Sequence, residues 1–154
     1  MAINYSIVIP YKNIKDLLLR CLHSMPRRED VEVIVVDDGS DPKNACTGSS
    51  FVKVIKTEAG KGAGAARNLG LREAKGKWVL FVDADDYLMP DALAVLVGQA
   101  ESKDYDVVVA GYHNFSEDGI ADFNTVLEER ELIGREAVRE YFARVYPNGE
   151  AGYL

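Results

Sequence analysis

The stretch Lys77-Trp-Val-Leu-Phe-Val-Asp-Ala-Asp-Asp86 is an apolar run followed at once by three carboxylates in four positions. The apolar run is typical of a buried strand, and we expect it near the centre of a sheet. The carboxylates of Asp83, Asp85 and Asp86 would repel one another at the rim of an apolar core, so a nearby cation would compensate for their charge. Mg²⁺ or Mn²⁺ fits this pattern, because each binds one or two carboxylates and completes its shell with phosphates and water. A solvated turn that leads into a helix N-cap explains the same residues equally well.

Three shorter β-branched segments precede this stretch, at residues 6–10, 31–36 and 51–55. The first should stop at Pro10, which cannot donate a backbone hydrogen bond. Helical patterns occur at residues 13–25, with Asn13 as the N-cap, and at residues 65–74. Strands that alternate with helices predict an α/β fold with an open, mostly parallel sheet flanked by helices.

The remainder of the chain is less clearly patterned. We expect a helix after Pro90, strands at residues 106–110 and 120–127, and a last helix. The apolar stripe of that helix would be Ala137, Val138, Tyr141, Phe142 and Val145. A chain of 154 residues has the size of one domain, and we predict a single domain over residues 1–154, with its motifs within residues 6–92.

Polar residues follow the predicted strands at three places, Tyr11 to Asn13, Asp37-Asp38 and Asp83 to Asp86. In open parallel sheets, ligands bind outside the carboxyl ends of the strands. A carboxylate at position 37 or 38 can accept hydrogen bonds from a nucleobase imide or from ribose hydroxyls. The alternative for this pair is an Asx-turn with Gly39 at positive φ.

A glycine-rich loop at residues 60–64 leads into the second helix. Backbone N–H groups at such a helix start attract phosphate, and Arg67 would either bind a phosphate oxygen or brace an aspartate. The loop also matches a dinucleotide-binding fingerprint, with Asp83 at a suitable distance. Residues 57–59 weaken that alternative, because they separate the preceding strand from the first glycine.

Composition excludes several classes of protein. The chain carries 18 basic and 25 acidic side chains, so we expect no general nucleic-acid binding. The longest uninterrupted apolar run, residues 78–82, is far shorter than the ~20 residues of a membrane helix, and the N-terminus does not resemble a signal peptide. Cys21 and Cys46 have no zinc or CxxC spacing and are expected as reduced thiols. We predict a cytoplasmic protein that at most touches the inner face of the membrane.

Taken in order, four segments resemble family 2 glycosyltransferases of the GT-A fold. They are Ser6-Ile-Val-Ile-Pro-Tyr-Lys-Asn13, Val31-Glu-Val-Ile-Val-Val-Asp-Asp-Gly-Ser-Asp41, Gly62-Ala-Gly-Ala-Ala-Arg-Asn-Leu-Gly70 and Gly76-Lys-Trp-Val-Leu-Phe-Val-Asp-Ala-Asp-Asp86. The resemblance implies an enzyme of polysaccharide biosynthesis that transfers a sugar, with inversion, from a nucleoside-diphosphate donor. The donor would most often be a UDP-sugar, and the acceptor a saccharide or a lipid-linked molecule.

The resemblance also implies roles for individual residues. Pro10, Tyr11 and Asn13 would border the nucleobase and ribose, and Asp38, with Asp37 beside it, would contact the uracil. Arg67 would lie near the base and the diphosphate. Asp83 would approach the ribose or the metal, and Asp85 would be the principal ligand of Mn²⁺ or Mg²⁺. The metal would offset the charge that develops on the leaving diphosphate.

Family members usually extend well beyond this length and carry an acidic general base in their second half. We identify no such base in this chain and expect the donor-binding half of an enzyme, either catalytic or limited to nucleotide-sugar binding. Uncovered apolar surface on such a half would favour self-association.

Overall fold

A computed structural model of the chain describes residues 2–58, 60–102, 105–116, 119–125, 131–137 and 139–140. Contacts divide the chain into two units, with the boundary between Leu93 and Ala94. The first unit contains every residue that the sequence singles out as part of a site. The single domain expected over residues 1–154 stays a prediction.

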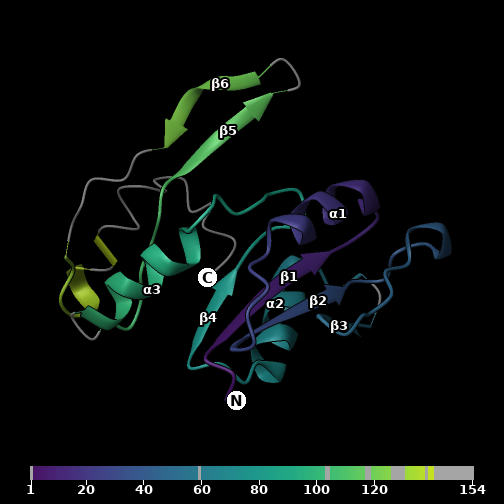
Figure 1. The fold of residues 1–154 in the computed structure, drawn as a ribbon, viewed down its shortest axis with the longest axis horizontal. Helices are drawn as coiled ribbons and strands as arrows, with labels where there is room; N and C mark the ends of the chain where they lie inside the picture. The colour runs from purple at the N-terminus through teal and green to yellow at the C-terminus, as the bar shows by residue number, and fades with distance from the viewer. Residues whose placement is uncertain are drawn as a thin grey trace. The chain divides into compact units, whose positions relative to one another are not determined.

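The first unit is built on a parallel sheet of four strands, β1 (Tyr5–Tyr11), β2 (Val31–Asp37), β3 (Val52–Lys56) and β4 (Trp78–Phe81). Their order is β3-β2-β1-β4 (Figure 1). This confirms the predicted mostly parallel sheet flanked by helices. The expected central position of the strand at residues 77–82 is wrong, because β4 lies at the end of the strand order and β1 and β2 lie inside it.

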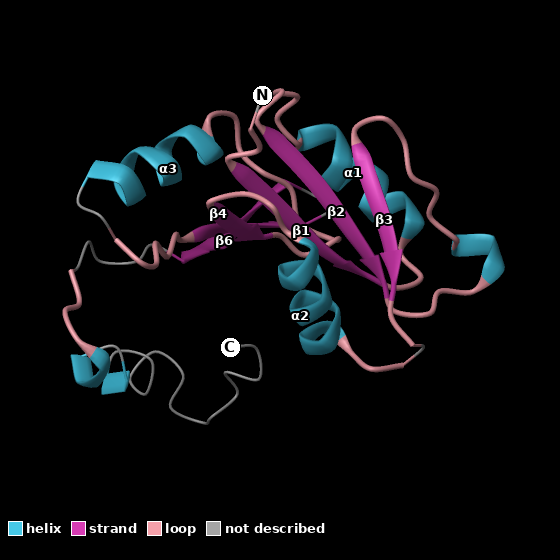
Figure 2. Ribbon diagram, turned by 90° about the horizontal axis from the view of Figure 1, so that it is seen from below, coloured by secondary structure: helices cyan, strands magenta, loops and turns pink. Residues whose placement is uncertain are grey.

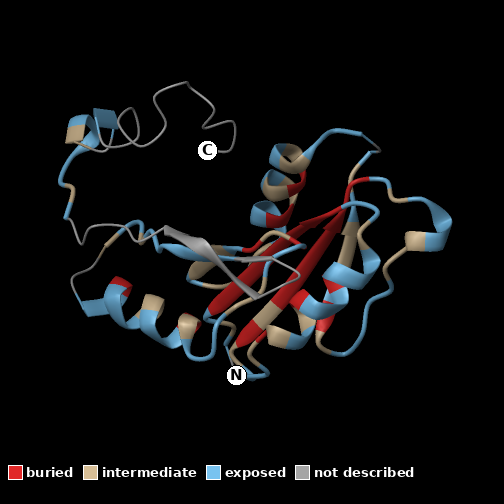
Figure 3. Cartoon of the chain, turned by 90° about the horizontal axis from the view of Figure 1, so that it is seen from above, coloured by how far each residue is buried: buried red, intermediate tan, exposed pale blue. Residues whose placement is uncertain are grey.

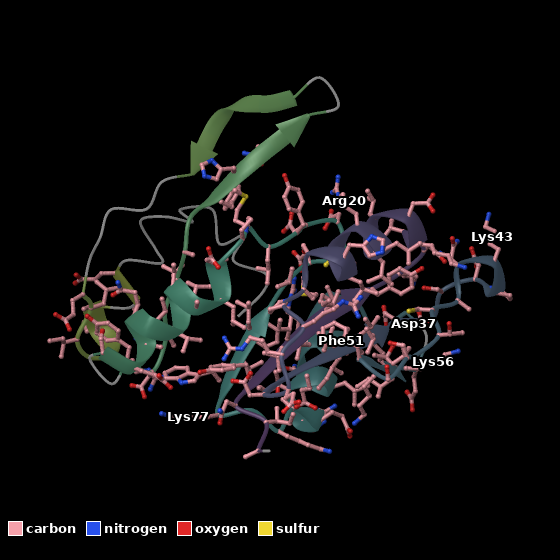
Figure 4. The ribbon with its side chains drawn as sticks, viewed as in Figure 1. Arg20, Asp37, Lys43, Phe51, Lys56 and Lys77 are labelled. Carbon is pink, nitrogen blue, oxygen red and sulfur yellow. The ribbon has the colours of Figure 1, made fainter. Side chains whose placement is uncertain are left out.

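Strand β1 continues to Tyr11, one residue beyond the proline at which we expected it to stop. Strand β4 pairs with β1 only as far as Val8, whereas β2 pairs with it along its full length. Pro10 therefore has a strand neighbour on one side only, where a missing N–H is tolerated. The register places Tyr11 beside Asp37, and Asp37 beside Lys56, at the carboxyl end of the sheet. Asp37 and Lys56 are labelled in Figure 4.

Helices α1 (Lys15–Ser24) and α2 (Ala63–Glu73) cover opposite faces of this sheet (Figure 2). Alternate residues of a strand point to opposite faces, so both faces of the two inner strands must be apolar. These strands are buried along most of their length (Figure 3). On the α2 side, Val8, Ile34 and Val36 form one cluster with Ala66 of the helix.

Helix α2 lies very close to the sheet at Gly70. A Cβ atom at this position would overlap the side chain of Val8 and would lie 3.2 Å from a methyl group of Val36. The missing side chain therefore allows α2, the helix that carries Arg67, to pack directly on β1 and β2.

The expected N-cap of the first helix is wrong. The helix begins at Lys15, with Ile14 at the N-cap, and Asn13 adopts a left-handed conformation with φ of 60°. The side-chain oxygen of Asn13 instead accepts a hydrogen bond from the N–H of Asp41, at 2.8 Å. Asn13 thus holds the loop after β2, which contains the short 3₁₀ helix η1 (Pro42–Asn44).

The second unit contains most of α3 (Ala92–Ser102) and an antiparallel pair, β5 (Tyr112–Ser116) and β6 (Gly119–Thr125). The predicted strand at residues 106–110 is wrong, because these residues form no strand and Val107 is 72% exposed. The strand predicted at residues 120–127 agrees with β6 up to Thr125. Of the predicted last helix, residues 135–137 and 139–140 are helical, and its remaining residues lie outside the described part of the chain.

Candidate functional site

An open hollow of about 260 Å³ lies at the carboxyl ends of β1 and β4. Its lining comes from the end of β1 and the turn after it, the start of α2, and the turn after β4. Five residues singled out from the sequence line it, namely Pro10, Tyr11, Arg67, Asp83 and Asp85. Residues from distant parts of the sequence meet here because neighbouring parallel strands end at one edge of the sheet.

Arg67 and Asp83 form an ion pair within this hollow. The Arg67 Nη2 atom lies 2.5 Å from Asp83 Oδ1. The arginine side chain is 17% exposed, whereas the aspartate side chain is 48% exposed. Of the two roles expected for Arg67, bracing an aspartate is the one that the structure shows. The pair presents a positive and a negative group side by side on the wall of the hollow.

The acidic residues after β4, Asp83 to Asp86, form a turn, which we call the acidic turn. Strand geometry ends at Phe81, and the N–H of Asp86 donates to the carbonyl of Asp83, at 3.0 Å. Burial raises the pKa of Asp86, and the nearby charges of Asp85 and Asp83 raise it further. The turn therefore concentrates negative charge, and two of its three carboxylate residues line the hollow.

The residue types of this turn fit a divalent cation of the Mg²⁺ or Mn²⁺ kind. Asp83 and Asp85 supply carboxylate oxygens, the ligands that these ions prefer. Burial is the main cause of the raised pKa of Asp86, and repulsion by Asp85 and Asp83 adds to it; a cation would relieve this repulsion. Among the described residues, no three His, Cys, Asp or Glu side chains form a metal-binding group by themselves. Two carboxylates that share a cation with the phosphates of a ligand match the usual magnesium arrangement.

Asp38 lies beside the hollow but does not line it, and its side chain holds the glycine-rich loop. Its carboxylate accepts hydrogen bonds from the N–H of Lys61 at 3.1 Å, from the N–H of Gly62 at 2.8 Å, and from the hydroxyl of Thr57. Burial alone would raise the pKa of Asp38. The hydrogen bonds from Thr57, Gly62 and Lys61, with the charge of Lys12, outweigh that effect, so the pKa lies below its usual value.

Asp37 is buried and forms the turn that we considered as its alternative role. Its Oδ1 atom accepts a hydrogen bond from the N–H of Ser40 at 2.8 Å, and Gly39 has a φ of 78°. The contact of Asp37 and Asp38 with a nucleobase stays a prediction.

In a dinucleotide-binding fingerprint, the backbone N–H groups of the loop bind the pyrophosphate. In the loop before α2, the N–H groups of Lys61 and Gly62 instead donate hydrogen bonds to the carboxylate of Asp38 and are not free for a phosphate. Negative charge at a helix N-terminus is favourable, and here a protein carboxylate supplies it. This arrangement weighs against the NAD-binding alternative.

Asn13 lines a second, neighbouring hollow of about 360 Å³, with Ile14, Lys43 and Asn44 among its other lining residues. Its backbone N–H donates to the hydroxyl of Ser40, at 3.0 Å. Of the residues predicted to border the nucleobase and ribose, Pro10 and Tyr11 line the first hollow, whereas Asn13 lines the second.

Four residues of the first hollow were not predicted from the sequence, Lys12, Ile14, Ala63 and Ala84. Lys12 and Ala84 lie between predicted residues and could have been included on position alone. Ala63 could have been found from helix geometry, because it lies four residues before Arg67 and hence on the same face of α2. Ile14 has no such signal.

The family model "Glycosyl transferase family 2" matches residues 6–145. The chain belongs to glycosyltransferase family 2. Its relatives include "Glycosyltransferase GlyG" of Streptococcus pneumoniae, which is 32% identical over 73% of this chain and 40% of the relative. The "Poly(ribitol-phosphate) beta-glucosyltransferase" of Bacillus spizizenii is 30% identical over 93% of this chain and 22% of the relative.

Solved glycosyltransferase structures have a similar fold. The crystal structure of S. aureus TarS 1-349 aligns with a TM-score of 0.61 at 28% identity, covering 71% of this chain and 36% of that one. A mannosyltransferase from Pyrobaculum calidifontis, in complex with GDP-Man and Mn²⁺, aligns with a TM-score of 0.56 over 73% of this chain and 35% of that one, and its 23% identity supports the fold alone. The family 2 chain spans 40% or less of the length of each of these relatives. Within its described residues, no helix has the length and apolar character needed to span a membrane.

Proposed function

We propose that the chain binds the nucleoside-diphosphate sugar of an inverting glycosyltransferase, with UDP as the nucleotide and a saccharide or a lipid-linked molecule as the acceptor. The observation that carries this proposal is the hollow at the sheet edge. It brings Arg67, Asp83 and Asp85 from two separate segments into one lining, together with Pro10 and Tyr11. A diphosphate needs a cation, and a shared divalent metal needs carboxylates; this lining offers both.

Each side chain has a task that follows from its charge and position. Pro10 and Tyr11 provide the surface against which the nucleobase and ribose rest, with Asn13 at the edge of the loop beside them. Arg67 provides a guanidinium for phosphate oxygens, which bind such groups well. Asp38 holds the loop that leads into α2, and thus fixes the start of the helix that carries Arg67.

Asp85 and Asp83 would hold Mn²⁺ or Mg²⁺, which when bound offsets the charge on the leaving diphosphate. Asp83 contributes to two interactions, since its carboxylate also pairs with Arg67. We assign no general base to the described residues.

A thermal-shift panel tests the proposal. UDP, GDP, CDP and ADP are compared with and without Mn²⁺, and we expect UDP with Mn²⁺ to raise the melting temperature most, because a ligand that binds only the folded state stabilises it. Asp85→Asn should remove the part of the shift that depends on Mn²⁺. Asp41→Asn, an equivalent change at an exposed position of the neighbouring loop, should leave the shift unchanged. A chain whose melting temperature responds to none of the four nucleotides would contradict the proposal.

A second function for the same site is nucleotide-sugar binding without transfer, and the absence of an assigned base motivates it. Product analysis with UDP-sugars separates the two. Release of UDP in the presence of an acceptor supports transfer, whereas binding without UDP release supports a binding module. Action on the cytosolic side, peripheral contact with the membrane and self-association stay predictions.

A further inference from the structure

Helix α1 is attached to the acidic turn and the residues after it by side chains of its last two turns. Arg20 Nη2 donates a hydrogen bond to the backbone carbonyl of Asp85, at 2.5 Å. One turn further along the helix, the hydroxyl of Ser24 accepts a hydrogen bond from the N–H of Leu88, at 3.0 Å. Both contacts use main-chain atoms, one within the turn and one two residues after it, so they fix the path of this segment and leave the carboxylates of the turn available.

Arg20 makes a second contact with the same segment. Its guanidinium lies over the ring of Tyr87, 5.4 Å from the ring centre. A planar guanidinium can donate a directed hydrogen bond and stack on an aromatic ring simultaneously, which an ammonium group does less well. Arg20, labelled on α1 in Figure 4, thus restrains the residues on both sides of Asp86.

The charge of Arg20 acts on the same residues. Its positive charge lies near Asp86, the third carboxylate of the turn. Arg67 pairs with Asp83 from the other helix. The acidic turn is therefore held between two arginines from opposite faces of the sheet. Arg67 lines the hollow, whereas Arg20 is not among its lining residues.

We propose that Arg20 is a positioning residue that fixes the backbone of Asp85, so that the Asp85 carboxylate faces the hollow and can bind the divalent cation. This inference rests on the proposed function, in which Asp85 is a metal ligand. Arg20 acts through the carbonyl of Asp85 and through Tyr87, and it touches neither the nucleotide nor the cation.

Two effects of Arg20 on metal affinity have opposite signs, and this makes the inference testable. Its positive charge repels a cation, so an effect of charge alone predicts tighter Mn²⁺ binding when Arg20 is neutralised. Its hydrogen bond and stacking hold the ligand in place, so a positioning role predicts weaker Mn²⁺ binding. The direction of the change therefore separates the two roles.

The experiment measures free Mn²⁺ by electron paramagnetic resonance in titrations with saturating UDP. We expect Arg20→Gln to weaken Mn²⁺ binding about tenfold, the size of effect found when residues behind a metal ligand are changed. Arg20→Lys keeps the charge and one donor, and should lie between wild type and Arg20→Gln. The matched control is Arg27→Gln, because Arg27 also stacks on a ring, that of Phe51 at 4.9 Å. Among the described residues, Arg27 makes no contact with the acidic turn.

Unchanged or tighter Mn²⁺ binding by Arg20→Gln would overturn the inference. If that variant does not fold, Arg20→Lys decides, and an affinity equal to wild type would overturn the inference in the same way. A wild-type chain that binds UDP with no Mn²⁺ uptake, or binds no UDP, would remove the proposed function itself, which separates the two failures.

Discussion

The carboxylate of Asp38 lies 2.8 Å from the N–H of Gly62, the residue at the N-cap of α2. The end of one strand therefore supplies the negative group that a helix start requires, in a place where the sequence around Gly62 offers no capping side chain. Because Arg67 lies on the same helix, the position of the guanidinium in the hollow depends on a residue that does not line it.

Replacing Asp38 by Asn should destabilise the fold. The substitution removes the charge that accepts hydrogen bonds from Thr57, Lys61 and Gly62, and loss of hydrogen bonds to a buried charged group costs about 1–3 kcal/mol. Denaturant unfolding at pH 7 measures this difference. Equal unfolding free energies for the two proteins would contradict the assigned role.

The effect of Asp38→Asn should depend on pH in a defined direction. The pKa of Asp38 is lower in the folded chain than the value of about 3.9 expected in an unfolded one. Its contribution to stability is therefore complete above the unfolded-state pKa, and it is lost as the pH falls through the lower, folded-state pKa. We expect the stability difference between wild type and Asp38→Asn to be constant near neutral pH and to narrow below pH ~4.

Arg67→Gln should weaken UDP binding about tenfold or more, because a hydrogen bond to a charged group contributes about 1.5–3 kcal/mol. Its effect on stability should be smaller, since the partner Asp83 is about half exposed. Isothermal titration calorimetry with UDP and Mn²⁺ provides the affinity. Arg72→Gln, an exposed change on the same helix, is the control, and equal affinities for the two variants would argue against a role for Arg67 in binding.

Two glycines of α2 should respond to alanine in opposite ways. Gly70→Ala forces a methyl group into Val8 and should destabilise the chain by about 1–3 kcal/mol. Gly64→Ala meets nothing within 4 Å, and should be neutral or stabilising by up to ~1 kcal/mol, the helix propensity difference. Thermal unfolding of both variants checks this, and a Gly70→Ala protein as stable as Gly64→Ala would show that α2 can lift from the sheet at little cost.

The two cysteines should differ in reactivity. Cys21 is completely buried, and burial, with the charges of Asp86 and Asp85, raises its pKa to about 12. Cys46 is partly exposed. Since the thiolate is the reactive form, a disulfide reagent at pH 8 should modify one thiol in the folded chain and both after denaturation. Cys46→Ser should remove the reaction of the folded chain, and a remaining fast reaction would mean that Cys21 is accessible.

The strands and helices of the first unit could be predicted because their apolar periodicities are unambiguous. The four strands of the sheet alternate with two helices, and the predicted ranges agree with the observed ones to within a few residues. Local pattern does not determine order in a sheet, however. The segment at 77–82 is the most apolar of the four predicted strands, yet Phe81 in β4 is 44% exposed. Strand β4 pairs with β1 alone and lies at the end of the strand order, and its composition does not reveal this.

The incorrect expectations share a cause in contacts that are distant in the sequence. Residues 106–110 have the composition of a strand, but a strand also requires a pairing partner. In this unit, β6 pairs with β5, and residues 106–110 pair with neither strand. Asn13 has the side chain of an N-cap, but the N–H of Asp41 binds its oxygen instead. Neither the missing strand partner nor the hydrogen bond from Asp41 can be predicted from the residues adjacent in the sequence.

The site could be predicted in its composition and less well in its internal contacts. Neighbouring parallel strands end at one edge, so Tyr11 and Asp83 had to lie near each other. The sequence did not predict that Asp38 would bind the loop at 61–62, because the loop conformation depends on Gly60 and Gly62 at positive φ as well as on the carboxylate. Nor did it predict the contact of Arg20 with Asp85.

The turn after β4 is attached to α1 through the carbonyl of Asp85 and the N–H of Leu88. Main-chain atoms are present whichever amino acid occupies a position. We therefore expect that protein engineers can exchange the carboxylate at position 85 for an imidazole or an amide group while the polypeptide keeps its course, whereas a change at position 83 would also break the ion pair with Arg67. With the proposed metal site, a short library at codon 85 should then yield variants with altered ion preference without a second round of repair to the scaffold.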